Sequence, residues 1–200
     1  MQQFIPDEQL TPFIREQLKR LAGGCVLLSR EELADPNFAN TVVLVCVHGD
    51  DGTFGLVINR PSHMPLNEVF DMDIPGARNT RKLYIGGPVK QEEMQLVQVT
   101  DAPVDNAFEV GSGVYLGGTW NSMDEILAAE ESNTRLFLGY SGWGSGQLEG
   151  EIIQGAWEVF RVDLVRLLRN SEENLIRPVG EIREYLRSLE TPPPEPAAGG

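Results

Sequence analysis

The stretch "TVVLVCVHGDDGTFGLVINRP", residues 41–61, decides the fold class of this chain. Two runs rich in β-branched and aromatic residues flank Asp51-Gly52, a pattern that predicts a β-hairpin with this pair in the turn. The first run is apolar on both faces, which is typical of a strand at the centre of a sheet. A sheet built around this hairpin is therefore the expected core of the protein.

Outside the hairpin, the pattern alternates between short strands and amphipathic helices. We expect strands at 25–29, 82–87, 94–100, 113–118, 134–142 and 156–162. We expect helices at 10–21, 122–132, 146–153, 163–170 and 180–190. Strands cluster early and helices are interspersed late, without a regular β-α-β period. This order favours an α+β fold over a doubly wound one.

The chain has 200 residues, a length that suits one domain with its own hydrophobic core. We expect a single domain over residues 1–189, with peripheral helices at both ends. The remaining stretch, 190–200, is rich in proline and cannot pack, so it is predicted to be a disordered tail. The N-terminus lacks the features of a signal peptide, and no stretch approaches the ~18 apolar residues of a membrane span.

The net charge limits the classes of binding partner, and the two cysteines indicate the redox state of the cellular compartment. The formal net charge is −14, so the field of the protein repels phosphate backbones, and direct nucleic-acid binding is not expected. Cys25 and Cys46 lie in apolar runs, which favours buried free thiols in a reducing compartment. A disulfide between adjacent strands is the alternative. We therefore expect a cytoplasmic protein with no membrane association.

The glycine-rich segment "LGYSGWGSGQLEGE", residues 138–151, lacks the deciding residue of three known motifs. Gln147 stands where a phosphate-binding Walker loop has lysine and where a dinucleotide turn has its third glycine. Trp143 stands where a nucleophile elbow would have glycine. Two interpretations remain: a structural turn with Trp143 packed on the core, which we favour, or a helix start whose N–H groups bind an anion.

A candidate ligand site follows if these glycines gather at one end of the sheet, where backbone could approach a ligand closely. Arg60, held between a strand and Pro61, would supply the counter-charge. The candidate residues are Asn59, Arg60, Gly86, Gly87, Ser141, Gly142, Trp143, Gly144, Ser145 and Gly146. The two histidines lie far in sequence from these serines, and the cysteines lack metal-ligand spacing. We thus expect no catalytic residues, no metal and no cofactor.

Four segments together resemble the AlgH/YqgE family of small bacterial proteins. They are "FGLVINRP" (54–61), "LYIGGPV" (83–89), "VYLGG" (114–118) and "GYSGWGSGQLEGEI" followed by "GAW" (155–157). The resemblance covers roughly residues 15 to 170. It implies an α+β domain with a bifurcated, mostly antiparallel, barrel-like sheet and flanking helices. It also implies a transcriptional regulator, through an association with exopolysaccharide control rather than through a DNA-binding module.

Our leading hypothesis is a non-enzymatic binding or regulatory protein that acts on a protein partner or a small anionic ligand, without direct DNA contact. The alternative is an enzyme or binder that acts on a small anionic or phosphorylated metabolite through the glycine-rich loop and Arg60. A third hypothesis, direct DNA binding, would need a basic face that this chain does not show in its sequence.

Overall fold

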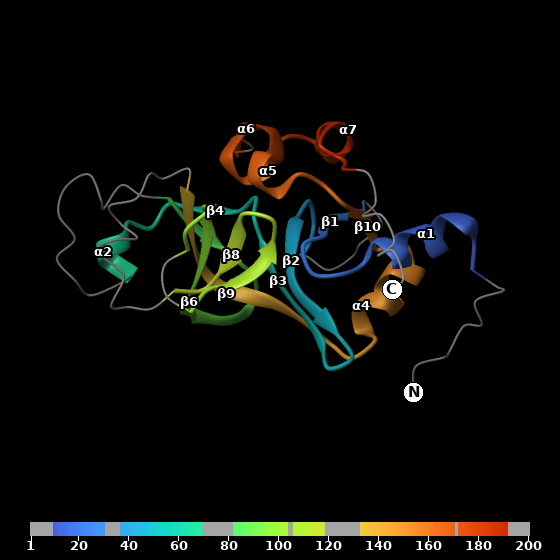
Figure 1. Ribbon diagram of the computed structural model, residues 1–200, viewed down its shortest axis with the longest axis horizontal. Helices are drawn as coiled ribbons and strands as arrows, with labels where there is room; N and C mark the ends of the chain where they lie inside the picture. Colours follow the sequence, from blue (N-terminus) through green and yellow to red (C-terminus); the bar gives the residue numbers. More distant parts are fainter. Residues whose placement is uncertain are drawn as a thin grey trace, which may run out of the picture.

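The computed structural model describes residues 10–30, 37–69, 82–103, 106–118, 133–170 and 172–191. Within them the chain forms one α+β domain, as the sequence predicted, with a large, mostly antiparallel sheet and helices packed around it (Figure 1). The sheet does not close into a barrel. The predicted helix 122–132 and residues 192–200 of the predicted tail lie outside the described residues.

The elements follow one another in an order that mixes short strands and helices. They are α1 (Pro12–Arg20), β1 (Val26–Ser29), β2 (Val42–Gly49), β3 (Gly52–Val57), β4 (Pro61–Ser62), α2 (Leu66–Val69), β5 (Leu83–Ile85), β6 (Val89–Val99), β7 (Phe108–Gly111), β8 (Val114–Leu116), β9 (Thr134–Gly144), α4 (Gln147–Ile153), β10 (Trp157–Phe160), α5 (Leu164–Asn170), α6 (Glu172–Leu175) and α7 (Val179–Ser188).

The predicted hairpin is confirmed as β2 and β3, which pair antiparallel on either side of the Asp51 turn. The register shifts between Val45 and Val47, so Cys46 occupies a bulge in β2. β2 also pairs with β1, which places it inside the sheet and explains why both of its faces are apolar.

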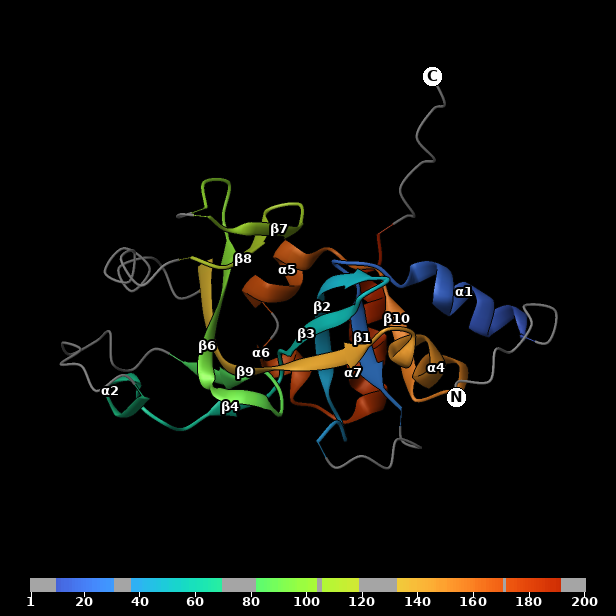
Figure 2. The same cartoon turned by 90° about the horizontal axis from the view of Figure 1, so that it is seen from below.

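The eleven-residue strand β9 joins the two parts of the sheet. Its first part pairs antiparallel with β6 and parallel with β5, whereas residues 141–144 pair antiparallel with β3. Figure 2 shows β9 running as one long strand between the β2–β3 hairpin and the strands β6 and β8. The strand order β10-β1-β2-β3-β9-β6-β8-β7, with β4 and β5 branching from β9, makes the sheet bifurcated.

The core consists of two main apolar clusters, one on each face of the central strands. Helices α5, α6 and α7 cover the cluster that contains Cys46, and α1 and α4 cover the cluster that contains Cys25. Both cysteines are therefore buried as free thiols, on different faces of the sheet. Burial raises the pKa of the Cys25 thiol to about 11 and raises that of Cys46 further.

The carboxylate of Glu172, at the start of α6, connects the C-terminal helices to β5. It accepts hydrogen bonds from Lys82 Nζ and from Tyr84 Oη, the latter at 2.5 Å. Burial alone would raise the pKa of the Glu172 carboxyl. The bonds from Lys82 and Tyr84, with the positive charges of Lys82 and Arg135, outweigh burial and hold the pKa below its ordinary value.

Several predicted boundaries change for reasons of pairing. The predicted strand 134–142 continues to Gly144, because β3 supplies a partner for its last residues. At the C-terminal end, Glu190 bridges to Val162, and Thr191 N donates to the Arg161 carbonyl, so pairing extends past Leu189. Among the helices of the described residues, none combines the length and apolar character that crossing a membrane requires.

Candidate binding site

The structure distributes the predicted ligand-site residues over three places. Asn59 and Arg60 border an open cavity near the start of α7. Gly86, Gly87 and Ser141 lie together where β5 meets β9. Residues 142–146 continue along the edge of β3 to the start of α4. The ten residues therefore do not border one common cleft.

The second group, at the β5–β9 junction, uses its polar atoms for internal contacts. Ser141 is fully buried, and its Oγ donates to the Gly86 carbonyl at 3.1 Å. The same carbonyl accepts from Val57 N at 2.8 Å. Gly87 has φ +157°, and a Cβ there would lie 2.2 Å from the Tyr140 carbonyl oxygen. Glycine at these positions lets two backbones approach each other closely.

The third group forms the end of β9 and the turn into α4. Trp143 is opposite Thr53 in the sheet and is only 4% exposed. Gly144 N donates to Gln147 Oε1 at 3.0 Å, so this amide is satisfied by a side chain of α4. Gly146 then caps α4 in the left-handed conformation, φ +70°. This geometry makes the segment a tight connection between a strand and a short helix.

Glu151 of α4 holds the same turn through two tryptophans. Its Oε2 accepts from Trp143 Nε1 at 2.9 Å and from Trp157 Nε1 at 2.8 Å. Its Oε1 accepts from Gln147 Nε2 at 3.0 Å. The two indole rings also meet edge to face, with centroids 6.0 Å apart. One carboxylate thus satisfies two buried donors and fixes α4 on the sheet.

His48, Thr53 and Glu149 form a polar cluster near the tip of the hairpin, which was not predicted from the sequence. His48 Nδ1 is 2.7 Å from Thr53 Oγ1, and His48 Nε2 is 3.7 Å from Glu149 Oε1. The order hydroxyl, imidazole, carboxylate is that of a nucleophile with its base. However, Thr53 is only 7% exposed within the β2–β3–β9 ladder, and the carboxylate is beyond hydrogen-bond distance. The cluster therefore links the hairpin to α4.

The cavity beside Arg60 has a volume of about 770 Å³ and is lined by residues 39–40, 59–60 and 175–179. Arg60 donates from Nη1 to the Asn37 carbonyl at 2.6 Å and from Nη2 to the Ala39 carbonyl at 3.2 Å. These bonds fix the guanidinium against the loop that precedes β2. The charge of Arg60 is consequently held in place at the cavity wall.

Asn59 fixes the other wall of the cavity. Its Oδ1 accepts from Val42 N at 2.9 Å. Its Nδ2 donates to the carbonyls of Asn40 and Leu175, at 2.9 and 3.0 Å. One side chain therefore connects β2, the loop before β2 and the segment that leads into α7. Internal hydrogen bonds therefore hold the walls of the cavity in place.

Arg177 is the second cation of this cavity, and the sequence analysis missed it. Its Nη1 lies 3.8 Å from Glu181 Oε2, a long pair between half-exposed side chains. The next residue, Pro178, is the N-cap of the ten-residue helix α7, and no side chain caps this helix. The positive end of the α7 dipole therefore adds to the two arginines. A sequence signal did exist: both cations precede a proline, at 60–61 and 177–178.

No group of three or more His, Cys, Asp or Glu side chains that could hold a metal ion occurs within the described ranges. The candidate site is thus defined by two guanidinium groups, polar amides and a helix start. We name it the Arg60–Arg177 pocket.

Comparison with known proteins shows that the chain is similar in sequence to several bacterial proteins. A family model described as AlgH-like matches residues 26–180. A UPF0301 protein of Myxococcus xanthus is 36% identical over 143 residues, which cover 70% of this chain and 78% of that protein. A UPF0301 protein of Chlorobium limicola is 33% identical over 145 residues, covering 70% and 75%.

Two solved structures resemble the fold. The solution structure of the AlgH protein from Pseudomonas aeruginosa matches with a TM-score of 0.68 and 27% identity, covering 94% of this chain and 92% of that one. A crystal structure of a Corynebacterium diphtheriae protein matches with a TM-score of 0.59 and 30% identity, covering 70% and 75%. Neither description states an activity.

Proposed function

The chain belongs to the AlgH-like family, and from this premise and its geometry we propose that it is a non-enzymatic binding protein for a small anionic ligand. The ligand occupies the Arg60–Arg177 pocket. One observation carries the proposal: two Arg-Pro pairs, far apart in sequence, bring two guanidinium groups to one cavity at the start of α7.

The chemistry of the pocket suits a carboxylate or a phosphate group. Guanidinium presents a planar fork of donors that matches either anion, and a helix start adds a favourable dipole. Apolar side chains of Leu175, Ile176 and Val179 line the same cavity and suit a short carbon skeleton. The volume lies within the range of small-molecule sites.

Binding rather than catalysis is favoured by what surrounds the ligand position. The Arg60–Arg177 pocket contains no histidine, serine or cysteine among its described lining residues. The cluster of His48 with Thr53 and Glu149, which brings a base to a hydroxyl, lies at the hairpin tip and involves none of the pocket residues. We propose that the protein acts through a change in partner binding when the ligand is present. The net charge of −14 argues against direct contact with DNA.

The test is isothermal titration calorimetry with inorganic phosphate, citrate and 3-phosphoglycerate as the probes. For a probe that binds the wild type, we expect Arg177→Ala to lower the affinity by about tenfold or more, because a charge-assisted hydrogen bond is lost. Arg166→Ala, an exposed arginine on α5 outside the pocket, is the matched control and should leave the affinity unchanged. Equal affinities in wild type and Arg177→Ala, or no binding of any probe at millimolar concentration, would overturn the proposal. Turnover of a probe would favour the enzyme alternative.

A further inference from the structure

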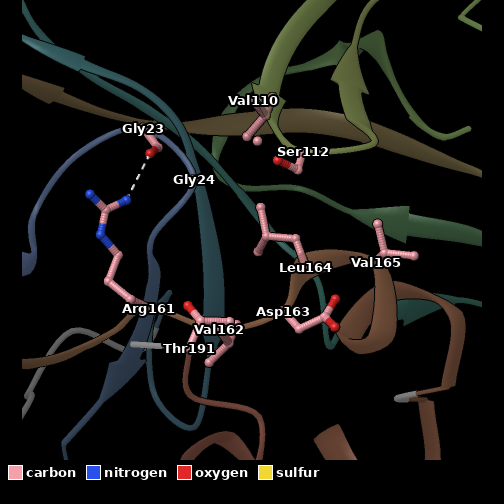
Figure 3. Close-up of a pocket in the computed structure, with 11 residues that line it drawn as sticks. Gly23, Gly24, Val110, Ser112, Arg161, Val162, Asp163, Leu164, Val165 and Thr191 are labelled. Atoms are coloured by element: carbon pink, nitrogen blue, oxygen red, sulfur yellow. Dashed lines mark hydrogen bonds between the residues drawn. The ribbon is translucent and has the colours of Figure 1, made fainter. Parts of the chain in front are cut away.

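A second cavity, of about 620 Å³, opens on another part of the molecule and shares no residue with the Arg60–Arg177 pocket. Three of its walls come from the turn before β1, the β7–β8 turn, and the connection from β10 to α5; Thr191 completes it (Figure 3). Four chain segments thus converge on it. We name it the Arg161 pocket.

Arg161 is the cation of this pocket. Its Nη1 donates a hydrogen bond to the Gly23 carbonyl at 3.2 Å (Figure 3). No carboxylate of the described chain lies within salt-bridge distance of it, whereas Arg183, also partly buried, pairs with Glu158 at 2.7 Å. A guanidinium carries five N–H donors, so most donors of Arg161 remain available. A partly buried charge in this condition favours an anionic partner.

Asp163 supplies the opposite charge on the same pocket, since both it and Arg161 line the cavity. Its Oδ1 accepts from Arg166 N at 2.9 Å and so caps α5. Its second carboxylate oxygen has no partner among the residues that the structure describes. In Figure 3 the Arg161 guanidinium and the Asp163 carboxylate point away from each other, toward different ends of the pocket.

Between these charged groups the pocket is lined by apolar side chains and by glycines, which present no side chain. Val110, Leu164 and Val165 line it. At Gly111 a Cβ would lie 2.9 Å from Leu164 Cδ1, so a side chain there would crowd the pocket against Leu164. Gly24 has φ +79°, and a Cβ would lie 2.7 Å from the Val110 carbonyl. Glycine at these two positions therefore keeps the walls close together and free of side chains.

We propose that the Arg161 pocket binds a small zwitterion with an apolar body, of the class of hydrophobic amino acids and their short peptides. The ligand carboxylate pairs with Arg161, its ammonium group lies at Asp163, and its side chains contact Val110 and Leu164. A net-neutral ligand fits better than a phosphate, because the pocket contains a carboxylate and the whole protein carries −14. The volume accommodates a dipeptide.

The test uses L-leucyl-L-leucine, its N-acetyl derivative and its C-terminal amide as probes, titrated into isotopically labelled full-length protein. Amide chemical shifts of Val110, Gly111 and Leu164 should move with the free dipeptide. Each blocked derivative should bind about tenfold more weakly, since each loses one charge-assisted contact. Equal affinity for all three probes, shifts confined to other residues, or no shifts at all would overturn the proposal.

Two variants assign each end of the ligand. Arg161→Ala should remove the preference for the free dipeptide over its amide. Asp163→Asn should remove the preference over the N-acetyl form, and it keeps the cap of α5 because asparagine is an equally good N-cap. Arg177→Ala, which alters the other pocket, should change neither preference. A loss of preference in Arg177→Ala equal to that in Arg161→Ala would contradict the assignment to this cavity.

Discussion

Removal of the Glu151 carboxylate tests whether the glycine-rich segment, residues 138–151, has a structural role in stabilising the fold. In Glu151→Ala, two indole donors lose their acceptor, and both rings are buried, with 4% exposure at Trp143 and 1% at Trp157. An unsatisfied buried donor costs about 1–3 kcal/mol, so the pair would cost about 2–6 kcal/mol. Glu151 is itself partly exposed, and water could enter its place. We therefore expect the free energy of unfolding to fall by about 3 kcal/mol.

The control variant is Glu149→Ala, on the same helix and of the same residue type. Glu149 has a single long contact with His48 and is 37% exposed, so its removal should cost about 0–1 kcal/mol. Urea unfolding followed by circular dichroism measures both. With an m-value of about 2–3 kcal/mol/M, Glu151→Ala should lower the midpoint by about 1 M or more.

A third variant, Glu151→Gln, keeps an acceptor oxygen with two lone pairs and should recover part of the loss. If Glu151→Ala and Glu149→Ala destabilise the protein equally, within about 0.5 kcal/mol, the indole contacts do not hold the turn. The conclusion that Glu151 fixes α4 on the sheet through the two tryptophans would then fail.

Three further predictions concern glycine, cysteine and pH. Gly87→Ala should destabilise the protein by at least about 3 kcal/mol, because the new Cβ would lie 2.2 Å from a backbone oxygen. In Gly150→Ala the new Cβ has no atom within 4 Å, so this variant should gain about 0.5–1 kcal/mol of helix stability. Thermal unfolding of the two variants compares these effects. Cys25 and Cys46 should not react with a thiol reagent at pH 8 until denaturant is added; prompt reaction in the folded state would contradict their burial. The lowered pKa of Glu172 stabilises the fold above the ordinary glutamate pKa of about 4.3, and this contribution is lost as pH falls through the folded-state pKa. Glu172→Gln should therefore lose less stability than wild type between pH 5 and 3, and an unchanged pH dependence would refute this assignment.

Local patterns in the sequence were sufficient for most of the longer elements of the fold, whereas the short elements β4, α2, β7 and α6 were not predicted. The hairpin at residues 41–61 pairs two segments that are neighbours in sequence, so its turn and both strands follow from residue propensity and spacing. The two roles of β9 could not be read in this way. Pairing with β3, β5 and β6 depends on contacts between distant segments, and the extension of β9 to Gly144 exists only because β3 lies beside it.

The candidate site shows the same division between local and distant information. Arg60 was identifiable because a strand and a proline flank it, but Arg177 reaches the same cavity only through the packing of α6 and α7. The role of Glu151 was hidden for a similar reason. Its spacing from Gln147 is visible on one helix, whereas the convergence of Trp143 and Trp157 on it requires the folded sheet.

The position of β9 also has a consequence for folding during synthesis. Gly52 of β3 pairs with Gly144 of β9, so the edge of β3 has no partner until the ribosome has made most of the chain. At the usual rate of about 5–20 residues per second, this edge waits several seconds beside the valine-rich strand β2. An unpaired strand edge is a template for other chains. Nascent copies of this protein are thus exposed to mispairing on a polysome throughout that interval, and a chaperone that shields strands would act on this hairpin.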